Sequence, residues 1–213
     1  MQRLRIRFGR SEKVKFISHL DLMRLWERAL RRSNLSLVYS EGFSPHPRIS
    51  MAAPLPVGVT SEDELMDVFL SNWISPNSFM DQVGNQLPDN VTMVEVWPVG
   101  LNEPSLQSRV RFAEYKVAVE TDRGIQEVKS ALKSLLSASE LPWQHFRDTG
   151  IRNYDLRVLV DDLWFIDLED FICTVGMRLT CGSQSTGRPE QVARALGFSR
   201  NPRLIHRTRL IFN

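Results

Sequence analysis

The N-terminal residues alternate between apolar and basic side chains, with the two-residue period of a half-buried β-strand. Between residues 2 and 8, apolar side chains occupy positions 4, 6 and 8, and arginines occupy positions 3, 5 and 7. The pattern then changes to that of an amphipathic helix, which Ser18 would cap and which would run to about Asn34. We therefore expect a strand followed by a helix, each with one basic face.

The rest of the first hundred residues contains strand and helix signals separated by Pro and Gly. The segment SEGFSPHPRIS, residues 40–50, has one Gly and two Pro among polar residues and is typical of a loop. The elements expected after the first helix are strands at 49–55 and 64–70, a helix at 75–87 and a strand at 91–97. The order strand, helix, strand, strand, helix, strand indicates a split βαβ, ferredoxin-like arrangement.

A similar order follows the polar stretch at 100–108. The expected elements are a strand at 109–120, a helix at 124–137, strands at 154–160 and 171–179, a helix at 189–196 and a strand at 204–212, with 143–147 as a further strand and 161–170 as part of a longer strand or hairpin. The sequence thus predicts an α+β fold of two ferredoxin-like (split βαβ) halves with antiparallel sheets. The first half would span 1–100, a linker 101–108, and a more divergent second half 109–213.

Charge is distributed unevenly along the chain, although the formal net charge is only +2. Residues 1–48 hold eleven basic and four acidic residues, whereas residues 49–108 hold eight acidic residues and no basic one. Of the 27 basic residues, 22 are arginine, whose planar guanidinium suits phosphate oxygens. The segregation indicates a polyanionic ligand, with ion pairing between the basic and acidic segments as the alternative.

Composition excludes several classes of protein and site. The chain has no apolar run long enough to span a membrane, so we expect a soluble, cytoplasmic protein. Its only cysteines, Cys173 and Cys181, are too few for an iron–sulfur or Cys-rich zinc site within the chain and are expected to be reduced. The five Trp residues are assigned to the cores.

Several segments of the chain carry a family resemblance. They are FISHLDL (16–22), Arg24, ERALRRSNL (27–35), YSEGFSPHPRIS (39–50) and PLPVGVTSEDE (54–64), and more weakly GSQSTGRPEQVARALGF (182–198) and IHRTRL (205–210). Together they resemble a bacterial family of unknown function that is linked to radical SAM proteins. Members of that family occur fused to a radical SAM protein or as a free-standing chain. The resemblance implies a radical SAM partner that holds S-adenosylmethionine and the iron–sulfur cluster, with no cofactor bound by this chain. It also implies an RNA-related or ribosome-related task.

Basic and aromatic residues form the main candidate site, in keeping with a nucleic-acid backbone as ligand. The residues expected to bind RNA or another anion are Arg24, Arg28, Arg31, Arg32, Tyr39, Phe43, Arg48, Arg188, Arg207 and Arg209. The strand arginines at 3, 5 and 7 would add to this surface if they converged with the helix arginines. The first hypothesis is therefore an accessory module without catalytic activity that binds RNA or presents a substrate to a partner enzyme.

Two further hypotheses come from other residues. His19 and His46 could act as base and acid in a metal-independent ribonuclease, because histidine titrates near neutral pH. A metal site built from these histidines with Asp21 and Glu41 ranks lower, since no zinc or iron spacing is present, and no metal is predicted. Alternatively, the acidic segment 60–70 could make the chain a protein-interaction adaptor that docks a basic partner.

Overall fold

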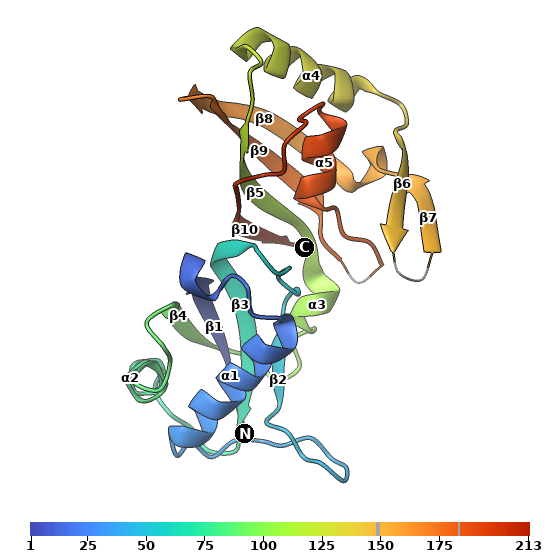
Figure 1. Cartoon of the computed structure of the whole chain (residues 1–213). Helices are drawn as coiled ribbons and strands as arrows, with labels where there is room; N and C mark the ends of the chain where they lie inside the picture. The colour runs from blue at the N-terminus through green and yellow to red at the C-terminus, as the bar shows by residue number, and fades with distance from the viewer. Residues whose placement is uncertain (148–149, 183) are drawn as a thin grey trace. The chain divides into compact units, whose positions relative to one another are not determined.

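The computed structural model describes residues 1–147, 150–182 and 184–213. The chain is a mixed α/β protein that divides into two compact units (Figure 1). The first unit comprises Met1–Val110 together with Asn213, and the second comprises Arg111–Phe212. None of the helices in the described ranges is long and apolar enough to cross a membrane.

The first unit is an antiparallel sheet whose two longer helices pack on one face. Its elements are β1 (Gln2–Arg10), a 3-10 turn (Glu12–Val14), α1 (His19–Arg32), β2 (Ile49–Met51), β3 (Thr60–Leu70), α2 (Pro76–Gly84), β4 (Val91–Val99) and α3 (Leu106–Arg109). The strands lie in the order β4-β1-β3, and β2 pairs with β3. The stretch at 101–108, expected to be a linker, lies in this unit, where the Arg3 guanidinium donates to the carbonyls of Glu103 and Pro104.

The second unit contains four sheet strands and a separate two-stranded hairpin. Its elements are β5 (Val110–Glu120), α4 (Ile125–Ser137), β6 (Pro142–Arg147), β7 (Gly150–Asp155), a 3-10 turn (Arg157–Leu159), β8 (Val160–Glu169), β9 (Ile172–Thr180), α5 (Pro189–Ala195) and β10 (Leu204–Phe212). The strands lie in the order β10-β5-β9-β8, and β6 pairs with β7. In both units the first strand therefore lies between the last strand and the one that precedes the second helix.

The boundary between β7 and β8 differs from the strand expected at 154–160. One oxygen of the Asp155 carboxylate accepts the backbone N–H groups of Leu141 (2.7 Å) and Arg157 (2.9 Å). This carboxylate turns the chain at the end of β7. Residues 161–169 belong to strand β8, which confirms that most of the 161–170 segment is part of a longer strand. The turn was missed because one of its two hydrogen-bonding partners lies 14 residues before Asp155.

The core of the first unit lies between the sheet and the helices α1 and α2. Leu4, Ile6 and Phe8 are fully buried, as is Trp26 of α1, whose ring centroid lies 5.0 Å from that of Phe8 in an edge-on arrangement. The predicted apolar face of the first strand is thereby confirmed. The assignment of every Trp to a core is wrong, because Trp73 is 76% exposed.

Alternation along β1 places its arginines on the sheet face opposite α1 and α2, where acidic residues neutralise them. Asp67 of β3 is fully buried and accepts hydrogen bonds from Arg3 (2.6 and 3.0 Å) and Arg5 (2.8 and 3.1 Å). Arg7 pairs with Asp63 at 3.2 Å and Glu95 at 3.3 Å. The strand arginines therefore do not converge with the helix arginines on one anion-binding surface, and pairing between basic and acidic segments accounts for this part of the charge pattern.

Both cysteines should be unreactive in the folded protein. Cys173 and Cys181 are free and buried, and burial, with a smaller contribution from Asp167, raises the pKa of the Cys173 thiol to about 11. At pH 8 only about one Cys173 in a thousand would be a thiolate, the form that reacts with disulfide reagents. We expect negligible reaction with Ellman's reagent at pH 8 in buffer and two reactive thiols per chain in guanidinium. Rapid reaction of the native protein would contradict the buried placement.

Candidate nucleic-acid interface

Helix α1 begins at a well-formed N-cap. The Ser18 hydroxyl accepts the N–H of Asp21 (3.1 Å) and donates to the Asp21 carboxylate (2.7 Å). This hydroxyl, together with Arg24 one turn later, holds the pKa of the Asp21 carboxyl below its usual range. Because Arg24 forms an ion pair with Asp21 at 3.1 Å, its charge is already compensated.

The other arginines of α1 remain available to a ligand. Leu22, Trp26, Ala29 and Leu30 are buried, so the opposite side of the helix faces solvent. That side carries Arg28, Arg31 and Arg32, which are exposed and form no ion pair with any carboxylate of the described residues. We call these three residues the arginine surface. Its charge lies in the last turns of the helix, where cations are also favoured by the helix dipole.

The segment 38–48 folds back on itself as a narrow loop beside this helix. The N–H of Ser40 donates to the carbonyl of His46 (2.9 Å), and that of Arg48 donates to Val38 (2.7 Å). At the tip, Gly42 has a φ of +130°, which side-chain-bearing residues rarely adopt. The next residue, Phe43, is fully exposed, so its ring is presented to solvent and does not pack in a core.

A histidine joins the loop to the helix. His46 Nδ1 lies 3.5 Å from the Glu27 carboxylate of α1, so the loop contacts this helix at His46. Tyr39, 44% exposed, lies in the same loop, and the Arg48 guanidinium stacks 4.1 Å from the ring centroid of Phe69. The structure therefore brings together, in the first unit, an uncompensated cationic helix face and a loop that carries exposed aromatic rings. Proteins that bind single-stranded nucleic acids combine positive charge with aromatic side chains in this way.

Three arginines predicted to bind RNA lie in the second unit. Arg188 and Arg209 are exposed. Arg207 is only 1% exposed and is among the largest buried side chains of the chain. The placement of Arg207 on an anion-binding surface is therefore not what the structure shows, because a buried guanidinium has no access to a phosphate backbone.

The pairing of His19 with His46 stays a prediction. His46 contacts Glu27, which lies eight residues after His19 in α1, a rise of about 12 Å along the helix axis. General acid–base cleavage needs both groups within hydrogen-bonding reach of one substrate. Among the residues that the structure describes, there is also no group of three His, Cys, Asp or Glu side chains able to hold a metal ion.

The acidic segment proposed as an adaptor surface is largely internal. Asp67 and Glu64 are at most 3% exposed, and Asp63 pairs with Arg7, which leaves Glu62 as the exposed member of the four. Most of the acidic side chains at 60–70 are therefore buried or paired within the first unit, and little negative charge is exposed to dock a basic partner.

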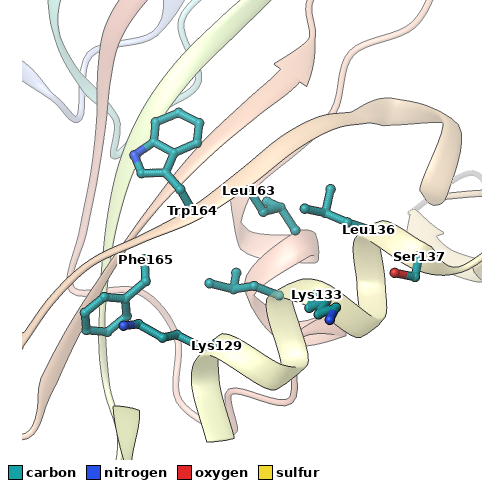
Figure 2. Close-up of a pocket in the computed structure, with 8 residues that line it drawn as sticks. Lys129, Lys133, Leu136, Ser137, Leu163, Trp164 and Phe165 are labelled. Carbon is teal, nitrogen blue, oxygen red and sulfur yellow. The ribbon is translucent and has the colours of Figure 1, made fainter. Parts of the chain in front are cut away.

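The second unit has a hollow between α4 and β8 that no sequence pattern indicated. It has a volume of about 510 Å³ and is lined by residues that include Leu136, Leu163, Trp164 and Lys133 (Figure 2). Trp164 pairs with Gly176 across the sheet, and a Cβ at position 176 would come within 1.9 Å of the indole. The glycine therefore makes room for the ring. The hollow is broad and open, and its lining is mostly apolar.

Comparison with solved structures shows a shared fold at very low identity. A chain in the crystal structure of a Cbf5-Nop10-Gar1 complex matches with a TM-score of 0.54 and 10% identity over 97% of this chain and 48% of its own. For the archaeal box H/ACA sRNP Nop10-Cbf5 complex the values are 0.52, 9%, 97% and 47%. For an H/ACA RNP bound to a substrate RNA containing 2'-deoxyuridine they are 0.51, 12%, 97% and 47%.

This chain thus spans about half the length of the solved chains that it matches. No curated protein matches the chain by sequence. A family model matches residues 3–189, which include the arginine surface, the 38–48 loop and most of the second unit. The chain therefore belongs to the bacterial family described as "Uncharacterized protein conserved in bacteria (DUF2344)".

Proposed function

We propose that this protein is an RNA-binding module without catalytic activity, and that the arginine surface and the 38–48 loop form its RNA contact. The observation that carries the proposal is that three exposed, uncompensated guanidiniums lie on α1, the helix that His46 of the 38–48 loop contacts, and that this loop carries the fully exposed Phe43. Guanidiniums neutralise phosphates in a sequence-independent way, and an exposed aromatic ring stacks on any base. The fold is shared with chains of H/ACA RNP structures, one of which is bound to a substrate RNA, and this supports the same interpretation.

Two finer parts of the proposal have different support. The common strand order of the two units supports an architecture of two ferredoxin-like halves. The radical SAM partner, with its S-adenosylmethionine and iron–sulfur cluster, is implied by the sequence resemblance. In that arrangement this chain would present an RNA or ribosome-related substrate, and the partner would carry out the chemistry. The partner is a separate proposal, so RNA binding can be tested on the chain alone.

Fluorescence polarisation with a labelled, mixed-sequence single-stranded RNA tests the contact at several salt concentrations. The triple substitution Arg28→Gln, Arg31→Gln and Arg32→Gln is expected to weaken binding at least tenfold at low salt. It should also make the slope of log K against log salt shallower by about 2, because each phosphate contact on a single strand contributes about 0.7. Unchanged affinity and slope would remove α1 from the RNA contact.

Two further variants separate charge from stacking. Arg24→Gln is the matched control on the same helix, and its effect should be smaller than that of Arg31→Gln because Asp21 already neutralises Arg24. Phe43→Ala should lower affinity by about tenfold with the salt slope unchanged, since stacking contributes about 1–3 kcal/mol per base. The bound RNA should remain intact on a denaturing gel. Shortened RNA would contradict the non-catalytic part of the proposal.

A further inference from the structure

A second pocket of the second unit differs in character from the hollow beside α4. It has a volume of about 280 Å³ and lies between the β6–β7 hairpin and the segments around 155–159 and 185–188. The volume lies near the lower limit for small-molecule sites, so it suits a ligand of modest size. Every lining residue belongs to the second unit, so the pocket is complete within it.

The polar part of this pocket is cationic. Arg152 and Arg188 both line it, and neither guanidinium forms an ion pair with a carboxylate of the described residues. The carboxylate of Asp155 is also present, but one of its oxygens is engaged by the N–H groups of Leu141 and Arg157. Two guanidiniums with one engaged carboxylate favour an anionic ligand, and their forked donors match phosphate oxygens.

A buried amide holds two ring side chains of the pocket in place. In the β6–β7 hairpin His145 lies opposite Arg152, and Tyr154 shares the face of Arg152. Gln191 of α5, 7% exposed, accepts the Tyr154 hydroxyl at Oε1, and its Nε2 lies 3.0 Å from His145 Nδ1. The amide therefore donates to Nδ1, so the neutral imidazole carries its proton on Nε2 and is itself a donor there.

The remaining lining residues add hydroxyl and aliphatic groups to the pocket. Ser185 and Thr186 contribute hydroxyls from a turn in which Thr186 Oγ1 donates to the carbonyl of Gly182 at 3.2 Å. Val158 and Leu159 contribute aliphatic surface, and the Arg152 guanidinium lies over the Tyr154 ring, 5.8 Å from its centroid. The pocket thus offers guanidiniums to a phosphate together with aliphatic and aromatic surface to a flat, partly apolar ring.

We propose that this pocket binds a nucleoside monophosphate, with the phosphate held by Arg152 and Arg188 and the nucleoside placed against Tyr154 and Val158. The same chemistry is offered by a free nucleotide and by the terminal nucleotide of an RNA. The proposal is independent of the RNA contact on the first unit, because it uses none of the residues of the arginine surface or the 38–48 loop. Of the residues that line this pocket, only Arg188 was expected from the sequence to contact an anion.

Calorimetric titration of the full chain with AMP tests the proposal. AMP is expected to bind saturably, and the double variant Arg152→Gln, Arg188→Gln should bind it at least tenfold more weakly. Arg194→Gln, an exposed arginine of α5 that does not line the pocket, is the matched control and should leave the affinity unchanged. Absence of AMP binding at millimolar concentration, or equal affinity in the double variant, would overturn the proposal.

Three comparisons define the ligand. Adenosine should bind at least tenfold more weakly than AMP, and inorganic phosphate that bound as tightly as AMP would overturn the nucleoside part. Competition with AMP by a 5'-phosphorylated but not a 5'-hydroxyl RNA oligonucleotide would assign the pocket to RNA ends, whereas competition by neither would assign it to free nucleotides. The triple arginine-surface variant should retain AMP binding, so failure of the RNA contact and failure of this pocket are distinguishable.

Discussion

Substituting Asp67 by Asn is expected to lower the free energy of unfolding by about 3–5 kcal/mol, the range measured when one partner of a buried ion pair is removed. The Asp67 side chain is fully buried between two guanidiniums whose side chains are 4% and 9% exposed. Without the carboxylate, the buried Arg3 pairs with no other carboxylate of the described residues, and Arg5 keeps only Glu103, 3.7 Å away, while water cannot solvate the two guanidiniums well. The loss comes from the charges left behind, so it exceeds the net contribution of the intact ion pairs.

Urea unfolding followed by tryptophan fluorescence measures this effect. Asp63→Asn is the matched control, because Asp63 also lies on β3 and also pairs with a β1 arginine, but the Arg7 side chain is 41% exposed. For such an accessible pair we expect a loss of about 0–1 kcal/mol. If the two variants lost similar stability, Asp67, Arg3 and Arg5 would not form a buried charge network.

Truncation of Trp26 to Ala is the second large expected effect, a loss of about 3–5 kcal/mol, because it leaves a large cavity in the core. Trp26 is fully buried and packs edge-on against Phe8. Its Nε1 is buried with no hydrogen-bond partner among the described residues, so the indole stabilises the core through packing alone. Trp26→Phe should therefore lose much less than Trp26→Ala, since it keeps a ring and removes an unsatisfied N–H.

The same unfolding measurement applies here, with circular dichroism as the probe because the substitution removes a fluorophore. Trp73→Ala, at a 76% exposed position, should change stability by less than about 0.5 kcal/mol. Trp26→Ala should also weaken RNA binding, because the arginine surface depends on how α1 is seated. A Trp26→Phe variant as unstable as Trp26→Ala would show that the indole N–H has a partner that stabilises the core.

Local patterns predicted most of the elements. The alternation at residues 2–8, the amphipathic run after Ser18 and the helix at 124–137 all reappear as β1, α1 and α4. These elements were accessible because their signals repeat every two or 3.6 residues within one short segment. The predictions failed where the deciding contact is remote in sequence. At Asp155, the hydrogen-bonding partner Leu141 lies just before β6, 14 residues earlier in the chain.

The candidate sites divide in the same way. Sequence identified the arginine-rich helix, the aromatic loop and the segregation of charge, because residue type and helical spacing suffice for those. The tertiary structure decides which arginines are available to a ligand. Arg3 and Arg5 pair with Asp67, which lies more than 60 residues away in the sequence. Arg31 and Arg32 pair with no carboxylate of the described residues. The tertiary structure also assembles the pocket of His145, Arg152 and Arg188. Charge compensation and pocket formation depend on strand register and long-range packing, which no local periodicity encodes.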